Sequence, residues 1–191
     1  MTRAYSGILV FFLAGFLVAA QAWSSPLSEG QVKRFVAVME ALQTSDTYLH
    51  ALDEAWDQGM KQKDTPVSVL VSDTVALLVG HDAHDVLERL VEEHGFADVD
   101  TWSSVGDRVM LAVMSLEMGD TAPTLEAEIP HISADLANNP NFSAEQKASM
   151  RNMLSHSAAL LAKVTKVPEA DRTAVRLYLG AVKRVLKYER G

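Results

Sequence analysis

The residues best suited to chemistry are the histidines and carboxylates of the segment His81-Asp82-Ala83-His84-Asp85. Two histidines three positions apart at the start of a helix can face the same way, and imidazole with carboxylate suits zinc, copper or nickel. His81 and His84 are therefore the candidate metal ligands. The sequence names no third ligand, because Asp85 points about 100° away from His84 on a helix. The alternative is an ordinary helix start, with Asp82 as the N-cap and the histidines solvated.

A row of basic residues near the C-terminus forms the second candidate site. Its spacings of 4, 7, 4 and 3 put these side chains along one side of a predicted last helix, where they could contact an anionic surface. The alternative is structural, because cations complement a helix C-terminus and could pair with the acidic segment 73–100. The row consists of Arg172, Arg176, Lys183, Lys187 and Arg190.

No catalytic motif is present, and we expect a protein that is not an enzyme. Ser155-His156-Ser157 puts hydroxyls beside an imidazole, but neighbours on a helix point about 100° apart. Met110, Met114 and Met118 could offer thioethers to copper, although methionines at helical spacing usually fill a core. Asp107 and Arg108 lie within the most apolar segment, so we expect at least one of them to hold another helix or a loop in place.

The elements that position these residues are predicted to be helices throughout. An apolar stripe at helical spacing that starts from Ser28, capping-box spacing at Ser143-Ala-Glu-Gln146, and glycines and prolines between the stripes indicate helical segments with short connections. Asp98 to Met118 is the most apolar of these and is predicted to be central. Pro130 predicts a kink or a late start in the helix that follows, and Pro168 opens the last helix. We expect a single-domain, all-α bundle of about six or seven helices.

The N-terminus carries the three parts of a secretory signal. A basic start with Arg3 precedes the uncharged run Ile8 to Ala20, and small residues follow at Ala20-Gln21-Ala22. The run is too short to span a membrane as a helix. We expect cleavage between Ala22 and Trp23, which divides the chain into a signal peptide, 1–22, and a soluble periplasmic or secreted domain, 23–191.

The mature chain is acidic. The whole sequence has 17 Lys and Arg against 25 Asp and Glu, and removal of Arg3 with the signal leaves a formal charge of −9. A negative surface argues against nucleic-acid binding, which depends on neutralising phosphates. We therefore expect binding either to another envelope protein or to a small apolar ligand.

Several segments resemble a group of uncharacterised exported helical proteins of Gram-negative bacteria. The resemblance rests on Leu27 to Phe35, on His94-Gly-Phe96 with the following Trp102, on Asp107-Arg-Val109, on Ser143 to Lys147, and on the Val175/Tyr178/Val182/Leu186 pattern. It implies a periplasmic, all-α protein and assigns no catalytic or binding residue.

Overall fold

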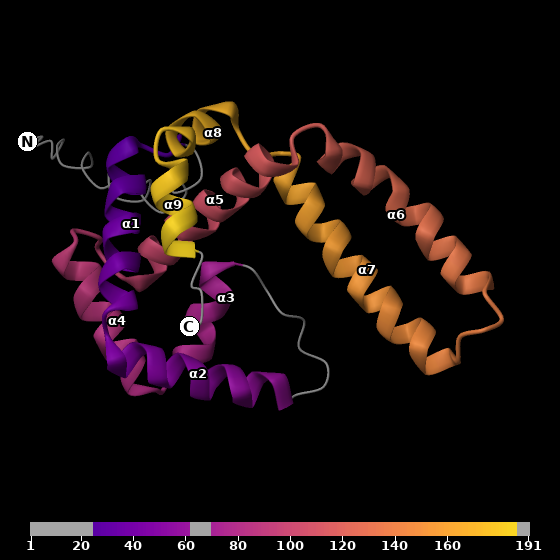
Figure 1. The fold of residues 1–191 in the computed structure, drawn as a ribbon, viewed down its shortest axis with the longest axis horizontal. Coiled ribbons are helices and arrows are strands. Elements are labelled where there is room, and N and C mark those ends of the chain that lie inside the picture. The colour runs from indigo at the N-terminus through magenta and orange to yellow at the C-terminus, as the bar shows by residue number, and fades with distance from the viewer. Residues whose placement is uncertain (1–24, 62–69, 187–191) are drawn as a thin grey trace, which may run out of the picture.

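The structure, a computed structural model, describes the backbone of residues 25–61 and 70–186 and the side chains of 25–54 and 70–186. These residues form nine α-helices and no strand, which confirms the all-α expectation but exceeds the expected six or seven helices (Figure 1). The helices are α1 (Glu29–Gln43), α2 (Asp46–Lys61), α3 (Val71–Leu78), α4 (Asp82–Glu93), α5 (Val99–Met118), α6 (Thr121–Asn138), α7 (Ala144–Val164), α8 (Glu169–Arg176) and α9 (Leu179–Leu186). The predicted signal and its cleavage site, Pro66, Lys187 and Arg190 lie outside the described residues.

Several predicted helix starts are confirmed at the level of hydrogen bonds. Ser28 and Ser143 each accept from the backbone N–H three residues on, and Gln31 and Gln146 return the bond, so both starts are capping boxes. The Asp98 carboxylate caps α5 by accepting from the Thr101 N–H at 2.6 Å.

Three expectations about helix ends were wrong. The N-cap of α4 is His81, not Asp82, and it makes no side-chain capping bond. Pro168 is the N-cap of α8 rather than its first residue. The segment predicted as a single last helix forms two helices, α8 and α9. Between them the backbone N–H of Tyr178 donates to the Val175 carbonyl three residues earlier, and this bond tightens the turn.

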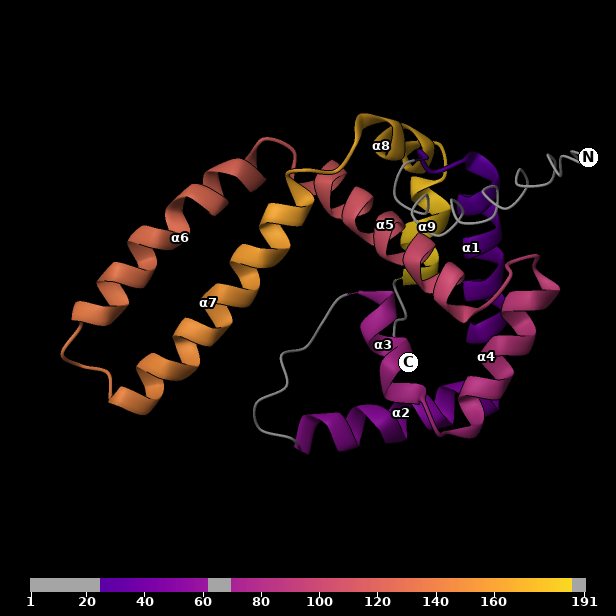
Figure 2. The same ribbon diagram turned by 180° about the vertical axis from the view of Figure 1, so that it is seen from behind.

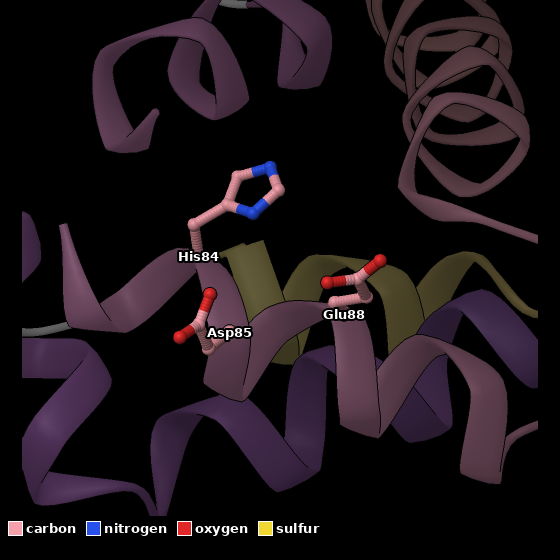
Figure 3. A group of neighbouring side chains, drawn as sticks. All are labelled: His84, Asp85 and Glu88. Atoms are coloured by element: carbon pink, nitrogen blue, oxygen red, sulfur yellow. The ribbon is translucent and has the colours of Figure 1, made fainter. Parts of the chain in front are cut away.

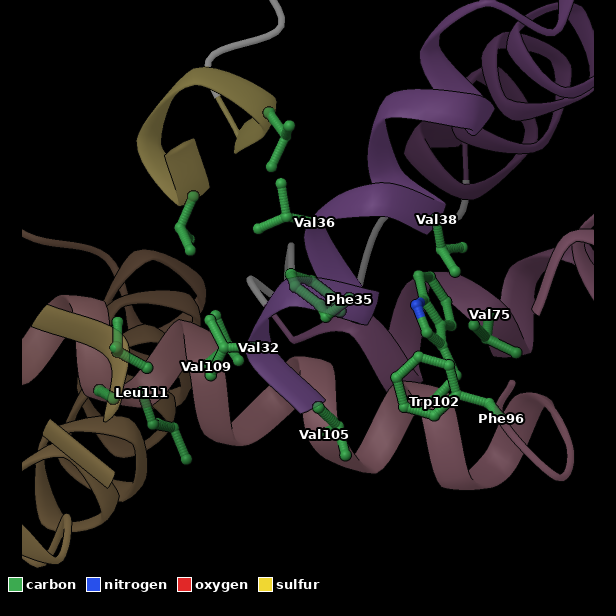
Figure 4. Packing of buried hydrophobic residues seen from close by; sticks show 14 of the residues in the cluster. Val32, Phe35, Val36, Val38, Val75, Phe96, Trp102, Val105, Val109 and Leu111 are labelled. Atoms are coloured by element: carbon green, nitrogen blue, oxygen red, sulfur yellow. The ribbon is translucent and has the colours of Figure 1, made fainter. Parts of the chain in front are cut away.

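Helix α5 is the centre of the core, as its composition predicted. It packs against α1, α3, α4, α6, α7 and α8. Trp102 is 1% exposed and stacks on Phe35 with ring centroids 5.7 Å apart (Figure 4). One turn on, Gly106 lets α1 and α3 approach closely, since a Cβ atom there would lie 2.8 Å from side-chain atoms of Phe35 and Val71.

Asp107 and Arg108 tie other segments to α5, which confirms the structural role predicted for them. The Asp107 carboxylate accepts from the backbone N–H and the hydroxyl of Ser72 and so caps the start of α3 from outside that helix. Arg108 forms a two-pronged ion pair with Asp171 of α8, and it also donates to the Ser25 carbonyl. Asp171 in turn accepts from the Leu27 N–H, so one buried ion pair joins α5, α8 and the segment before α1.

Helices α6 and α7 form an antiparallel hairpin that extends away from the other helices (Figures 1 and 2). They pack mainly on each other, and their contact with the body is with α5. α6 runs continuously through the exposed Pro130. None of the described helices has the length and the continuous apolar character that crossing a membrane requires.

Candidate functional site

A histidine and two carboxylates come together in the first two turns of α4. One ligand atom each from His84, Asp85 and Glu88 lies within 4.8 Å of the others (Figure 3). His84 is half-buried, whereas Asp85 and Glu88 are exposed. The structure thus joins one predicted ligand, His84, to two carboxylates that the sequence analysis did not propose as ligands.

His81 does not belong to this group of three. The pairing predicted for His81 and His84 assumed that both lie on the helix, but His81 has extended backbone angles, φ −104° and ψ 149°. The relation between positions i and i+3 on a helix surface does not hold for a residue outside the helix. Glu88 could have been found from the sequence, because it lies four positions after His84.

The predicted basic row is broken up by the turn between α8 and α9. Arg172 and Arg176 both pair with Glu169, at 2.6 and 3.5 Å, and Lys183 pairs with Glu117 at 2.6 Å. The hydrogen bond from Arg172 is the main cause that lowers the pKa of Glu169 below its usual value. The acidic partners therefore lie in α8 and α5 and not in the segment 73–100.

No recorded contact joins the remaining chemical candidates to one another among the described residues. The Nδ1 atom of His156 lies 2.7 Å from the Asn152 carbonyl oxygen, and the structure records no hydrogen bond between this imidazole and Ser155 or Ser157 in the described part of the chain. The three α5 methionines are half-buried. Met150 and Met153 are exposed on α7.

The hairpin carries a partly apolar surface, which we call the hairpin face. Four large apolar side chains on it are between 38% and 67% exposed, and two carboxylates lie beside them. The hairpin face consists of Leu125, Glu128, Ile132 and Asp135 of α6 and Met150 and Met153 of α7.

Helical geometry puts these residues on one side of the hairpin. Around the axis of α6, Leu125 and Ile132 lie about 40° and 60° from the half-buried Ile129. Both are displaced against the direction in which the chain winds. Met150 and Met153 lie about 40° and 100° back from the half-buried Leu154 of α7. In an antiparallel pair, rotation in the same sense from the line of contact leads to the same side of both helices, so the four apolar side chains share one face.

The charges of the hairpin face are all negative. Glu128 follows Leu125 by three positions and precedes Ile132 by four, and Asp135 follows Ile132 by three, so each carboxylate neighbours an exposed apolar side chain. Neither carboxylate takes part in an ion pair with any residue that the structure describes. α6 contains no lysine or arginine.

No protein-family model, no curated protein sequence and no solved structure matches this chain. The resemblance to exported helical proteins stays a prediction, and the functional argument depends on the residues themselves.

Proposed function

We propose that this chain is an exported, non-enzymatic protein of the Gram-negative cell envelope that binds another protein through the hairpin face. The observation that carries the proposal is the exposure of Leu125, Ile132, Met150 and Met153 on a hairpin that extends from the body. Scattered exposed apolar residues are ordinary, but a group on one face of a projecting element is typical of an interaction site. Methionine side chains also adapt to the shape of a partner.

The arrangement fits a helix as the partner's docking element. Two antiparallel helices leave a groove along each side, and a third amphipathic helix laid into this groove buries its apolar stripe. On this side of the hairpin, both helices present exposed apolar side chains. Docking would thus extend the two-helix arm into a three-helix bundle.

The negative charge of the hairpin face indicates a positively charged partner. Glu128 and Asp135 lack ionic partners in the described part of the chain, so we propose a helix that carries Lys or Arg beside its apolar stripe. A second copy of this chain docked by the same face would bring four carboxylates together, and an anionic membrane would repel them. The acidic rim therefore disfavours both of these occupants.

The test is a titration with two model peptides of about 20 residues, long enough to form helix on docking. One is an amphipathic leucine–lysine peptide and the other its leucine–glutamate counterpart. We expect the lysine peptide to bind and the glutamate peptide to bind at least about tenfold more weakly, as measured by fluorescence anisotropy.

The Ile132→Ser/Met153→Ser variant loses affinity for the lysine peptide by about tenfold or more. Glu128→Gln/Asp135→Asn loses affinity and also shows a smaller salt dependence.

Matched controls come from exposed residues off the face. Leu177 is 63% exposed between α8 and α9, and Glu145 is an exposed acid in the first turn of α7. Leu177→Ser and Glu145→Gln should bind the lysine peptide within about twofold of the unmodified protein. Equal losses in controls and face variants would reject the proposal. A dimer that Ile132→Ser dissociates, or binding to anionic vesicles that requires the face, would assign it to another occupant and reject the proposal as well.

Export has its own test. The predicted signal supports cleavage between Ala22 and Trp23 in Gram-negative cells. N-terminal sequencing of protein recovered from the periplasmic fraction should begin Trp-Ser-Ser. Full-length protein that stays in the cytoplasmic fraction would reject the proposed location.

A further inference from the structure

We propose that His84, Asp85 and Glu88 form a binding site for a zinc-type divalent cation on α4. The proposal is separate from the hairpin face, because α4 belongs to the body of the molecule (Figure 1). One imidazole nitrogen and two carboxylate oxygens are suitable zinc ligands, and a fourth position would be filled by water. The three ligand atoms come from neighbouring positions on one helix (Figure 3).

The geometry needs only a small adjustment. Ligands at about 2.0–2.2 Å from a tetrahedral ion lie about 3.3–3.6 Å from each other, compared with the 4.8 Å within which the three atoms already fall. Asp85 and Glu88 are exposed, so rotation about their side-chain bonds can close the difference. His84 and Glu88 are four positions apart and so face the same way.

The ligands are available. In the part of the chain that the structure describes, the side chains of His84, Asp85 and Glu88 make no hydrogen bond and no ion pair. A cation would therefore break no hydrogen bond or ion pair among the described residues. The nearest base in sequence, Arg89, is held by Glu93 at 3.1 Å.

The local charge attracts a cation. Residues 73–100 hold eight carboxylates against Arg89 alone. The N-terminal end of α4 carries the positive end of the helix dipole, which opposes a cation, but Asp82 and Asp85 in the first turn counter it. The first turn of α4 thus adds negative charge beside the ligands.

The experiment is isothermal titration of the purified protein with Zn²⁺, with Mg²⁺ as the comparison cation. We expect a single site for Zn²⁺ and no heat from Mg²⁺ at the same concentration, since Mg²⁺ prefers oxygen ligands and keeps its water. His84→Ala, Asp85→Asn and Glu88→Gln should each weaken Zn²⁺ binding by about tenfold or more. The exposed carboxylate variants keep the test valid if the half-buried His84 proves necessary for folding.

Two variants decide which ligands are used. Glu92→Gln changes an exposed carboxylate one turn further along α4 and should bind Zn²⁺ within about twofold of the unmodified protein. His81→Ala should do the same. Loss with His81→Ala but not with Glu88→Gln would restore the pair predicted from the sequence and overturn our ligand set. Equal binding by every variant would mean an adventitious ion only and would overturn the site altogether.

Discussion

At the scale of single residues, the most consequential contact is the buried pair of Arg108 and Asp171. Their side chains are 11% and 3% exposed, and the Nη2 to Oδ1 distance is 2.8 Å. The pair satisfies the Leu27 N–H and the Ser25 carbonyl as well. The segment before α1 is thus fixed to the core within a few residues of the predicted cleavage site.

Removing one partner of this pair should destabilise the protein strongly. Asp171→Ala leaves a buried guanidinium without its counter-ion and the Leu27 N–H without an acceptor, so we expect a loss of about 3–5 kcal/mol in the free energy of unfolding, measured by urea denaturation. The double variant Arg108→Met/Asp171→Leu should recover at least half of that loss, because it leaves no unpaired charge. A loss below about 1 kcal/mol for Asp171→Ala would contradict this role.

Tyr48 should make the fold sensitive to alkaline pH. Burial raises the pKa of Tyr48 to about 12, whereas an unfolded tyrosine titrates near 10. Between these values the unfolded chain releases the proton and the folded chain keeps it, so stability falls as pH rises, by at most about 1.4 kcal/mol per pH unit. Below about pH 9 this group has no such effect, because the tyrosine is protonated in both states. Unfolding curves of Tyr48→Phe between pH 9 and 12 should fall less steeply, and identical slopes would exclude this cause.

At the scale of elements, the packing of α5 depends on one position without a side chain. Gly106→Ala would put a Cβ atom 2.8 Å from atoms of Phe35 and Val71, so we expect a loss of about 1–3 kcal/mol in thermal or urea unfolding. Gly180 of α9 is the matched control, because a Cβ atom there meets nothing within 4 Å. Gly180→Ala should be neutral or stabilising by up to about 1 kcal/mol. Similar losses of stability for both variants would indicate that alanine is unfavourable at either glycine, rather than crowding at Gly106 alone.

The sequence predicts elements well where a local hydrogen bond defines them. Ser28, Ser143 and Asp98 start helices through side chains only three residues from their donors. It predicts poorly where tertiary contacts decide the boundary. Asp107 caps α3 from 35 residues away, and the break at Tyr178 interrupts an apolar stripe that suits a continuous helix. The candidate metal ligands show the same limit. The sequence predicts His81 and His84 as a pair on one helix, but His81 has an extended backbone at the N-cap of α4 and so does not join His84.

At the scale of the whole molecule, the projecting hairpin is the main feature that periodicity could not predict. An apolar stripe at helical spacing is the same whether it faces a core, a neighbouring helix or an absent partner. The stripe of α6 has Leu136 buried and Ile132, four positions earlier, 47% exposed. The packing of α6 and α7 on each other and on α5 shows which of these surfaces each apolar residue faces, and the sequence alone does not.

The hairpin should open more readily than the body. Its far part buries few side chains, whereas α5 is buried on several sides. Native-state hydrogen exchange should therefore give peptides from 126–157 a lower opening free energy than peptides from 99–118. Equal protection in both regions would mean that the hairpin and the core unfold as one unit. It would also remove the basis for regarding the hairpin as a separate arm.

The central claim is that the hairpin face is a docking surface for a basic amphipathic helix. The most direct measurement is hydrogen exchange of the protein with and without the leucine–lysine peptide, read peptide by peptide along the chain. We predict slower exchange in 125–135 and 146–157 and no change in α8 and α9, although Leu177 between them is 63% exposed. Protection spread over the body, or confined to α8 and α9, would contradict the claim.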